Sequence, residues 1–472
     1  MTDKKLGISD AATIGLELPA SDEATQGEWR KQGFVKSRLR SIAHLVSGNS
    51  ANAILMLVST TIAARSLGPG AYGILALVLT VGRLSERLLR FESWQPLIRY
   101  AAQEDVAKDP KRMSELYLYG LILDVGTALL AAVLTVVVGY ALMTVIGLRP
   151  EHMPLVIIYA LAIAINIRGV PTAALRFDGK FRTLAYVQML SSILRLGLAA
   201  IGLIQGFSLF QFVIIWTVAQ MLDELLFLWL GMRTIRKQGI PNPIFADWRG
   251  LSTKFPGFMK FAWSTNVSST LRTMTQEADT LLVSAVAGTA WAGFYHIAKR
   301  MAKVAQQVGS MMQAVVYPDM ARMWAKKDIA AFRRMTLRIQ SILLLVGLGI
   351  LLVFWLLGDW IMRVAFGPEF AQAYPLLVAQ LVAVVLIMHA GPSRSALLAM
   401  NRPGFVLAVA AVSTLVFFVT AWVAMPHYGA LGVNFAHIAF AALTAIAMDL
   451  AMWRHMGTAS RGEMPVPLAG TT

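Results

Sequence analysis

The chain alternates between long apolar runs and short polar segments. As a helix, each run is long enough, or nearly so, to cross the hydrocarbon core of a bilayer, which takes about 20 residues. Twelve runs follow one another, near 42–64, 71–98, 115–139, 153–175, 183–204, 209–232, 257–285, 290–316, 339–358, 370–391, 404–424 and 429–452. The pattern predicts an all-α integral membrane protein with twelve transmembrane helices.

The longest polar connector, 233–255, contains two prolines and several cations and leaves six runs on either side. We therefore expect two six-helix lobes. The predicted division is a cytoplasmic N-terminal tail with a basic interfacial helix (1–41), an N-lobe with spans 1–6 (42–235), a cytoplasmic inter-lobe linker (236–256), a C-lobe with spans 7–12 (257–453) and a cytoplasmic C-terminal tail (454–472).

Composition agrees with a membrane class, because 57% of the residues are hydrophobic and the mean hydropathy is +0.61. The absence of cysteine excludes structural disulfides and thiolate metal sites. The seven histidines do not show metal-ligand spacing, so we predict no metal site and no cofactor. The first 29 residues lack the apolar core of a signal peptide and are predicted to be a cytoplasmic tail.

Positive charge is distributed asymmetrically between the two sides of the predicted helices. With a cytoplasmic N-terminus, thirty of the 42 Lys and Arg residues fall in cytoplasmic segments and span ends, and only Arg65, Arg149 and Arg363 fall in outer loops. This bias places both termini in the cytoplasm. The net charge of +16 then indicates contact with anionic membrane lipids rather than nucleic acid, since no folded soluble domain carries it. Residues 29–45 are predicted to form a basic amphipathic helix at the inner surface.

Nine cations remain inside the apolar runs, where each costs roughly 2.5–3.5 kcal/mol at mid-bilayer unless it faces protein or water. In span 2, Arg83, Glu86, Arg87 and Arg90 follow i, i+3, i+4, i+7 spacing and so share one helix face. One carboxylate cannot neutralise three guanidinium groups, which favours a cationic ladder for phosphate. The alternative is intrahelical pairing of Glu86 with Arg83 and Arg90.

Span 8 carries Lys299, Arg300 and Lys303 and no acid. Span 7 supplies Arg272, Glu277 and Asp279, so the two spans could form a salt-bridge network. The same carboxylates could also exchange a proton or Na⁺ for a cationic partner when substrate arrives. We therefore assign substrate binding to the span 7 and span 8 cations, and ion coupling to Asp279, Glu277 and the span 2 residue Glu86.

The other intramembrane polar residues are interpreted as structural. Arg168 is expected to pair with Asp124, and Arg195 with Asp223 or Glu224. Polar candidates for lining or interhelical hydrogen bonding are His296, Asn49, Asn52 and Asn266.

A faint repeat relates the two halves. GPGAYG at 68–73 and GTAWAG at 288–293 share their glycine spacing at an offset of 220, which also places Arg83 on Lys303. An even number of spans per half predicts a parallel repeat, with an axis along the membrane normal.

Three segments give the chain a family resemblance: ARSLGPGAYG (64–73) with PLIRYAA (96–102), ADTLLVSAVAGTAWAGFYHIAKRM (278–301), and FGPEFAQAY (366–374). Between about residues 40 and 455 the chain resembles polysaccharide flippases of the Wzx type. These belong to the multidrug/oligosaccharidyl-lipid/polysaccharide (MOP) exporter superfamily. The resemblance implies a MATE-like fold in which spans 1, 2, 7 and 8 line a central cavity.

It also implies the transport of undecaprenyl-pyrophosphate-linked oligosaccharide across the bacterial inner membrane, for O-antigen or exopolysaccharide synthesis, beside other polysaccharide-assembly proteins. Twelve spans, without the two extra spans usual in lipid II flippases, favour a polysaccharide unit as substrate. One alternative is a cation-coupled drug or metabolite antiporter, which would need an acidic cavity. The other, a membrane polysaccharide polymerase, would need long outer loops with paired carboxylates, and the short outer segments argue against an enzyme.

Overall fold

The computed structural model describes residues 32–91 and 93–460, and within this part it contains helices and turns and no strands. The side chains of residues 32–51 and of scattered positions in α8, α11, α12 and α16, Arg272 among them, lie outside the described residues. The first half contains α2 (Gln32–Leu89), α3 (Trp94–Ala101), α4 (Glu104–Ala107), α5 (Pro110–Leu142), η2 (Pro150–His152), α6 (Met153–Ala164), α7 (Gly169–Phe177), α8 (Phe181–Gln205) and α9 (Leu209–Lys237). The second half contains η3 (Pro243–Phe245), α10 (Leu251–Lys254), α11 (Phe258–Ala287), α12 (Thr289–Ala325), α13 (Ile329–Phe366), η4 (Pro368–Ala373), α14 (Tyr374–Ala399), α15 (Pro403–Tyr428) and α16 (Ala430–Ser460).

The long α2 element is folded back on itself at Gly68. This residue has φ 70° and ψ 171°, a conformation that suits glycine, and it is followed by Pro69, which has no N–H to donate. Asn52, before the bend, contacts Ser192 of α8. Arg83, after the bend, lies close enough for its charge to act on Arg195, one helical turn along α8. Both arms of α2 therefore run beside the same stretch of α8.

Two of the predicted spans are broken inside the membrane region, which corrects the expectation of continuous helices. Span 2 stops at Leu89 and resumes as α3, and span 4 stops at Ala164 and resumes as α7. The breaks meet at the buried carboxylate of Asp124 on α5. Asp124 accepts hydrogen bonds from the Ser93 hydroxyl at 2.5 Å and from the Val170 backbone N–H at 2.9 Å. A carboxylate at the start of α7 satisfies backbone donors that lipid cannot.

Within the described part, nine helical segments are long and apolar enough to cross a membrane. One of them, Asn52–Ala101, includes both arms of α2 and therefore covers two predicted spans. The segments that contain α11 and α12 are not among the nine. These two helices carry the charges that were predicted for spans 7 and 8, and several of their positions lie outside the described residues, to which this count is limited. The exact number of spans stays a prediction.

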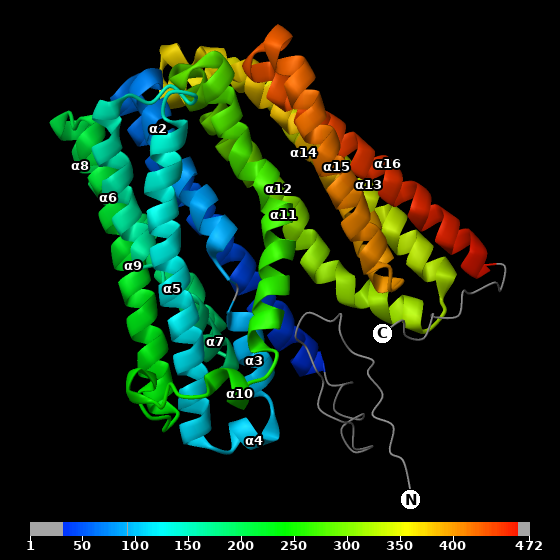
Figure 1. Cartoon of the computed structure of the whole chain (residues 1–472). Coiled ribbons are helices and arrows are strands. Elements are labelled where there is room, and N and C mark those ends of the chain that lie inside the picture. Colours follow the sequence, from blue (N-terminus) through cyan, green and yellow to red (C-terminus); the bar gives the residue numbers. More distant parts are fainter. Residues whose placement is uncertain (1–31, 92, 461–472) are drawn as a thin grey trace, which may run out of the picture.

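The helices form two groups that meet at one end of the molecule (Figure 1). In the N-lobe, α2 packs against α5, α6 and α8; in the C-lobe, α14 packs against α12, α13 and α16. The lobes converge at the turns near residues 68, 147, 288 and 367, an end that we name the closed face. There Ser284 donates a hydrogen bond to the Ile146 carbonyl at 2.7 Å, and Arg65 donates one to the Val364 carbonyl at 3.1 Å. Toward the opposite end, which carries the inter-lobe linker and which we name the linker face, the groups separate in Figure 1.

The first half of α11 remains attached to the N-lobe at the linker face. The Phe258 ring stacks on Tyr119 with centroids 4.5 Å apart, and the Asn266 amide donates to the Arg90 carbonyl at 2.6 Å. In the second half of α11, Asp279 contacts Lys299 and Tyr295 of α12 in the C-lobe. A single helix therefore contacts both lobes, and its polar residues lie where the two lobes meet.

Candidate functional site

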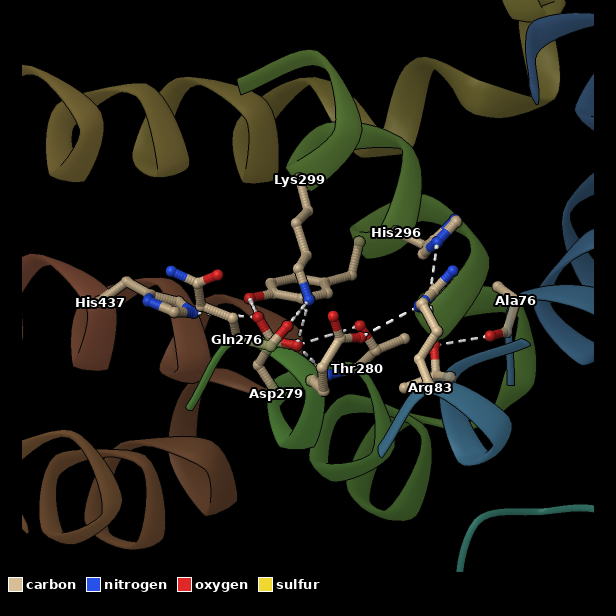
Figure 2. Close-up of polar contacts among 11 residues, drawn as sticks. Ala76, Arg83, Gln276, Asp279, Thr280, His296, Lys299 and His437 are labelled. Carbon is tan, nitrogen blue, oxygen red and sulfur yellow. Dashed lines mark hydrogen bonds and ion pairs between the residues drawn. The ribbon is translucent and has the colours of Figure 1, made fainter. Parts of the chain in front are cut away.

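An ion pair joins the two lobes inside the membrane region. The Nε of Arg83, on the second arm of α2, lies 3.2 Å from the Glu277 carboxylate on α11. The same guanidinium donates to the Thr80 hydroxyl at 3.1 Å and lies 3.5 Å from Nε2 of His296 on α12 (Figure 2). The buried His296 ring also contacts the Tyr72 hydroxyl through Nδ1 at 2.7 Å. Arg83 is therefore held by side chains of both lobes.

A second centre is built around the carboxylate of Asp279, which is completely buried. Its oxygens lie 2.7 Å from Nζ of Lys299 and 3.1 Å from Nε2 of His437, and they accept a hydrogen bond from Tyr295 at 2.9 Å. Figure 2 shows these groups arriving from three helices, with Asp279 on α11, Lys299 on α12 and His437 on α16. This carboxylate is thus the point at which α11, α12 and α16 are joined by charge and hydrogen bonds.

Further cations surround these two carboxylates. Arg300 is close enough to Arg83, Arg195 and Glu277 for their charges to act on it. Lys303 is likewise within range of the charges of Lys299, Arg300 and Glu277. Arg83, Arg195, Lys299, Arg300 and Lys303, which we name the cation cluster, outnumber Glu277 and Asp279 by five to two. Arg168 and its partners Asp223 and Glu224 adjoin Arg195 and together add one negative charge, so an excess of positive charge remains and favours an anion.

The four charged side chains that were predicted to form a ladder on span 2 lie in different environments. Glu86 accepts from Arg90 at 2.7 Å and from the Asn166 amide at 2.9 Å, so the alternative of intrahelical pairing is confirmed for Arg90. Arg83 instead turns to Glu277, and Arg87 is exposed. The four side chains therefore do not act as one row in this structure. The side chain of Arg272, a further predicted site residue, lies outside the described residues.

The ion pairs predicted for the other two intramembrane arginines of the N-lobe, Arg168 and Arg195, are wrong. The reason is the break in span 4. Arg168 lies at that break, and its Nε donates to both oxygens of Glu224, at 2.9 and 2.7 Å, while its Nη2 contacts Asp223. Arg195, 7% exposed, lies over the Trp216 ring at 5.8 Å, and the charge of Asp223 acts on it although the two side chains form no ion pair. Its Nε has no hydrogen-bond partner among the described residues.

A cavity of about 730 Å³ opens between the helices of the C-lobe beside this site. Its wall includes Lys299, Lys303 and Asp279, and amide groups of four glutamines line it as well: Gln276, Gln306, Gln313 and Gln380. The cavity also reaches Arg394 and His437. Ammonium and guanidinium groups bind phosphate, and amides donate to and accept from hydroxyl groups, so this lining suits a phosphorylated polar molecule. The described residues hold no group of three His, Asp or Glu placed to bind a metal ion.

The sequence singled out Arg83, Glu277, Asp279 and the span 8 cations, and the structure brings these together. It did not single out His437 or Tyr295, which complete the Asp279 centre. Helical spacing held one usable signal for His437, since Asn434, His437 and Thr444 share a face of an otherwise apolar span. The role of Tyr295 depends on how α12 packs on α11, which spacing alone does not reveal.

A family model described as polysaccharide biosynthesis protein matches residues 62–375, about two thirds of the chain. The chain belongs to this family. A curated relative, the inner membrane protein YghQ of Escherichia coli (strain K12), is 25% identical over 351 residues, which cover 74% of this chain and 98% of the relative.

Solved structures of the MOP superfamily share the fold. An inward-closed lipid II flippase MurJ aligns with a TM-score of 0.68 at 13% identity, over 89% of this chain and 90% of the other. An inward-facing MATE family transporter aligns with a TM-score of 0.63 at 15% identity, over 88% of this chain and 96% of the other. The predicted all-α membrane fold and the resemblance to MOP exporters are confirmed.

Proposed function

We propose that this protein is an alternating-access flippase for undecaprenyl-pyrophosphate-linked oligosaccharide. It would carry repeat units from the cytoplasmic to the periplasmic leaflet of a bacterial inner membrane, to supply O-antigen or exopolysaccharide synthesis. Membership of a polysaccharide biosynthesis family and a fold shared with a lipid II flippase support a substrate of this kind. The inner-membrane relative supports the location.

The observation that carries the proposal is the excess of cations at the junction of the lobes. Five cations and two carboxylates surround the contact between α2, α11 and α12. Such an excess is costly in a membrane unless an anion completes it. A pyrophosphate supplies that charge, and the glutamine-lined cavity beside Lys299 and Lys303 supplies hydrogen-bond partners for sugar hydroxyls.

The lobes provide a route for alternation. The positive-inside bias assigns the linker face to the cytoplasm, with both termini on that side. Contacts between the lobes at the closed face, such as the hydrogen bond from Ser284 to the Ile146 carbonyl, would then seal the periplasmic side. Opening to the periplasm requires that these contacts break and that others form near the linker face. The Arg83–Glu277 pair spans the junction, so it is the contact that substrate phosphate would compete for.

Ion coupling is assigned to carboxylates that already hold a cation. In this structure Asp279 neutralises Lys299. Phosphate that draws Lys299 away would leave Asp279 free to take a proton or Na⁺, and an ion on Asp279 would in turn release Lys299 to the substrate. Because such linkage is reciprocal, ion binding at Asp279 and substrate binding at Lys299 would each change the affinity of the other. The same exchange is possible at two other carboxylates. Glu277 is paired with Arg83 at the lobe junction, and Glu86 is paired with Arg90 in the N-lobe.

The test is an assay of lipid-linked oligosaccharide in cells that lack the gene and carry either wild type or Lys303→Ala. Complete units should accumulate in the cytoplasmic leaflet of Lys303→Ala cells, with the protein still inserted in the membrane. Lys260→Ala, an exposed cation on α11, is the matched control and should restore export. Normal export by Lys303→Ala would contradict the site. Single units accumulating outside would indicate a polymerase, and loss of drug resistance without any lipid phenotype would indicate an antiporter.

A further inference from the structure

One face of α9 carries apolar residues that end in cations at the linker face. Val218, Leu222, Leu225 and Trp229 recur at helical spacing and are all exposed, with Trp229 54% exposed. Arg233 continues the row one turn later, and its guanidinium lies over the Trp229 ring at 5.1 Å from the centroid. A helix that leaves a bilayer presents its residues in this order: aliphatic side chains face the acyl chains, tryptophan lies at the interface, and arginine reaches the headgroups.

A pocket of about 520 Å³ lies where this row ends. Arg233, Arg236 and Lys237 line it together with Trp229, and the turn at Asn242 and Pro243 forms its other side. Neither Arg233 nor Arg236 is paired with an acidic side chain within the described ranges. Asp178 lies close enough for the Lys237 charge to act on it, but this carboxylate already binds Lys180 at 2.5 Å. The pocket therefore presents three cations without a carboxylate in its lining.

The linker that leaves this pocket exposes large apolar side chains at the same end of the molecule. Phe245 is 85% exposed and Trp248 is 69% exposed, and Ile244 beside them is exposed as well. The segment is held in place, since Pro243 is buried and the Ser114 hydroxyl donates to the Pro241 carbonyl at 3.0 Å. Apolar side chains fixed beside a cationic pocket at a membrane-facing helix end match the interfacial layer of a bilayer, where both find partners.

We propose that this pocket binds the headgroup of an anionic phospholipid of the surrounding leaflet, with Ile244, Phe245 and Trp248 inserted at the interface. The lipid phosphate lies against Arg233, Arg236 and Lys237, and its acyl chains follow the row from Trp229 to Val218. Basic pockets between helices at the cytoplasmic side are a known way to retain such lipids. Bound there, the lipid holds the N-lobe end of the linker at the membrane surface while the C-lobe moves.

The experiment measures lipid retained by the full chain in neutral detergent, with phosphatidylglycerol added, by native mass spectrometry. The variant Arg233→Gln/Arg236→Gln/Lys237→Gln should bind phosphatidylglycerol roughly 100-fold more weakly, because each surface cation contributes about fivefold. Lys326→Gln/Lys327→Gln/Arg334→Gln removes the same charge from exposed positions elsewhere and should change binding little. Equal loss in both triple variants would show only general attraction and would overturn the site. So would unchanged binding in the pocket variant.

A second measurement tests the linker. The chain has no cysteine, so Phe245→Cys gives a single attachment point for a dye. In vesicles of phosphatidylglycerol and phosphatidylcholine, spin-labelled lipid should quench the dye more strongly than aqueous iodide does. Stronger quenching by iodide would contradict insertion, and would leave an exposed apolar surface suited to a partner protein. Both measurements are made without transport, so their failure is independent of the proposed flippase activity.

Discussion

Gly73 on α2 and Gly293 on α12 pack backbone against backbone at the closed face. A Cβ added to Gly73 would lie 1.8 Å from the Thr289 carbonyl oxygen, and one added to Gly293 would lie 2.6 Å from the Pro69 carbonyl oxygen. Small residues allow transmembrane helices to approach this closely. The two glycines also occupy equivalent places in the sequence repeat, at the offset of 220. The repeat therefore brings two copies of one packing surface together where the lobes meet.

Gly73→Ala should loosen the closed face. A methyl group that meets backbone atoms forces the helices apart, and overpacking typically costs about 1–3 kcal/mol. The measurement uses Ser284→Cys, a nearly isosteric replacement at a buried position whose thiol donates more weakly to the Ile146 carbonyl, so every variant is compared with this parent; labelling is by a membrane-impermeant maleimide from the closed-face side. Labelling should be slow in the Ser284→Cys parent and faster when Gly73→Ala is added. Gly126→Ala is the control, because a Cβ there meets nothing within 4 Å; equal labelling with Gly73→Ala and with this control would refute the prediction.

The Arg83–Glu277 pair should contribute to the same closure. Arg83→Gln removes the cation from a carboxylate that is mostly buried, so labelling of Ser284→Cys should rise. Exchanging the charges, with Arg83→Glu and Glu277→Arg together, should restore protection because the attraction between lobes returns. A double variant labelled as fast as Arg83→Gln would show that the pair does not bridge the lobes. Transport is measured in parallel, because Arg83 is also proposed to bind the phosphate of the substrate.

Features set by neighbouring residues in the sequence were predicted well, whereas contacts between residues far apart in the sequence were not. The apolar runs and the position of the linker follow from local composition, and the structure bears out the helical architecture. The intramembrane charges on α2, α11 and α12 were found because isolated cations in lipid are costly. Their partners were predicted less well. Arg168 was assigned to Asp124, whereas Asp124 satisfies the start of α7 and Arg168 binds Asp223 and Glu224.

The errors share a physical origin. The helix breaks after Leu89 and after Ala164 interrupt long, mostly apolar runs, so apolar periodicity did not reveal them, although Pro96 and Pro171 stand in the first turns of the helices that follow. Each break changes the direction in which the side chains of the next helix point. It also leaves the first backbone N–H groups of that helix without an intrahelical partner. Both effects depend on which helices are neighbours, and that is decided by tertiary packing.

The Asp279–Lys299 pair should show strong energetic coupling. Asp279→Asn leaves the Lys299 ammonium inside the protein without its anion, which costs about 3–5 kcal/mol when a buried pair is broken. Lys299→Met added to Asp279→Asn should recover much of that loss, as measured by thermal unfolding in detergent. The exposed pair Asp319–Arg322 is a control, with an expected coupling of about 0.2–1 kcal/mol. Additive losses at Asp279 and Lys299 would mean that the two charges do not interact.

Alkaline pH should release the linker. The Lys254 ammonium lies 2.7 Å from Glu115 and 3.4 Å from Asp247, and the hydrogen bond that it donates to Glu115 raises the pKa of Lys254. A raised folded pKa stabilises the protein fully below the unfolded pKa of about 10.4, and the contribution disappears as the pH rises through the folded pKa. Proteolysis of the linker should therefore accelerate above that range in wild type. In Lys254→Met it should already be faster at pH 8 and change less at alkaline pH; an identical pH profile in both proteins would exclude the contact.

Two buried arginines of the N-lobe should respond in opposite ways to the same substitution. Arg168→Met leaves Asp223 and Glu224 without a cation, so the protein should lose about 3–5 kcal/mol of stability. Arg195→Met removes a guanidinium whose Nε has no hydrogen-bond partner among the described residues, so stability should hold or increase. Transport by Arg195→Met should nevertheless fall, because one of the five charges of the cation cluster is gone. Thermal unfolding and the leaflet assay measure the two effects separately. Stable Arg168→Met protein, or normal export with Arg195→Met, would reverse the roles that the structure gives to these residues.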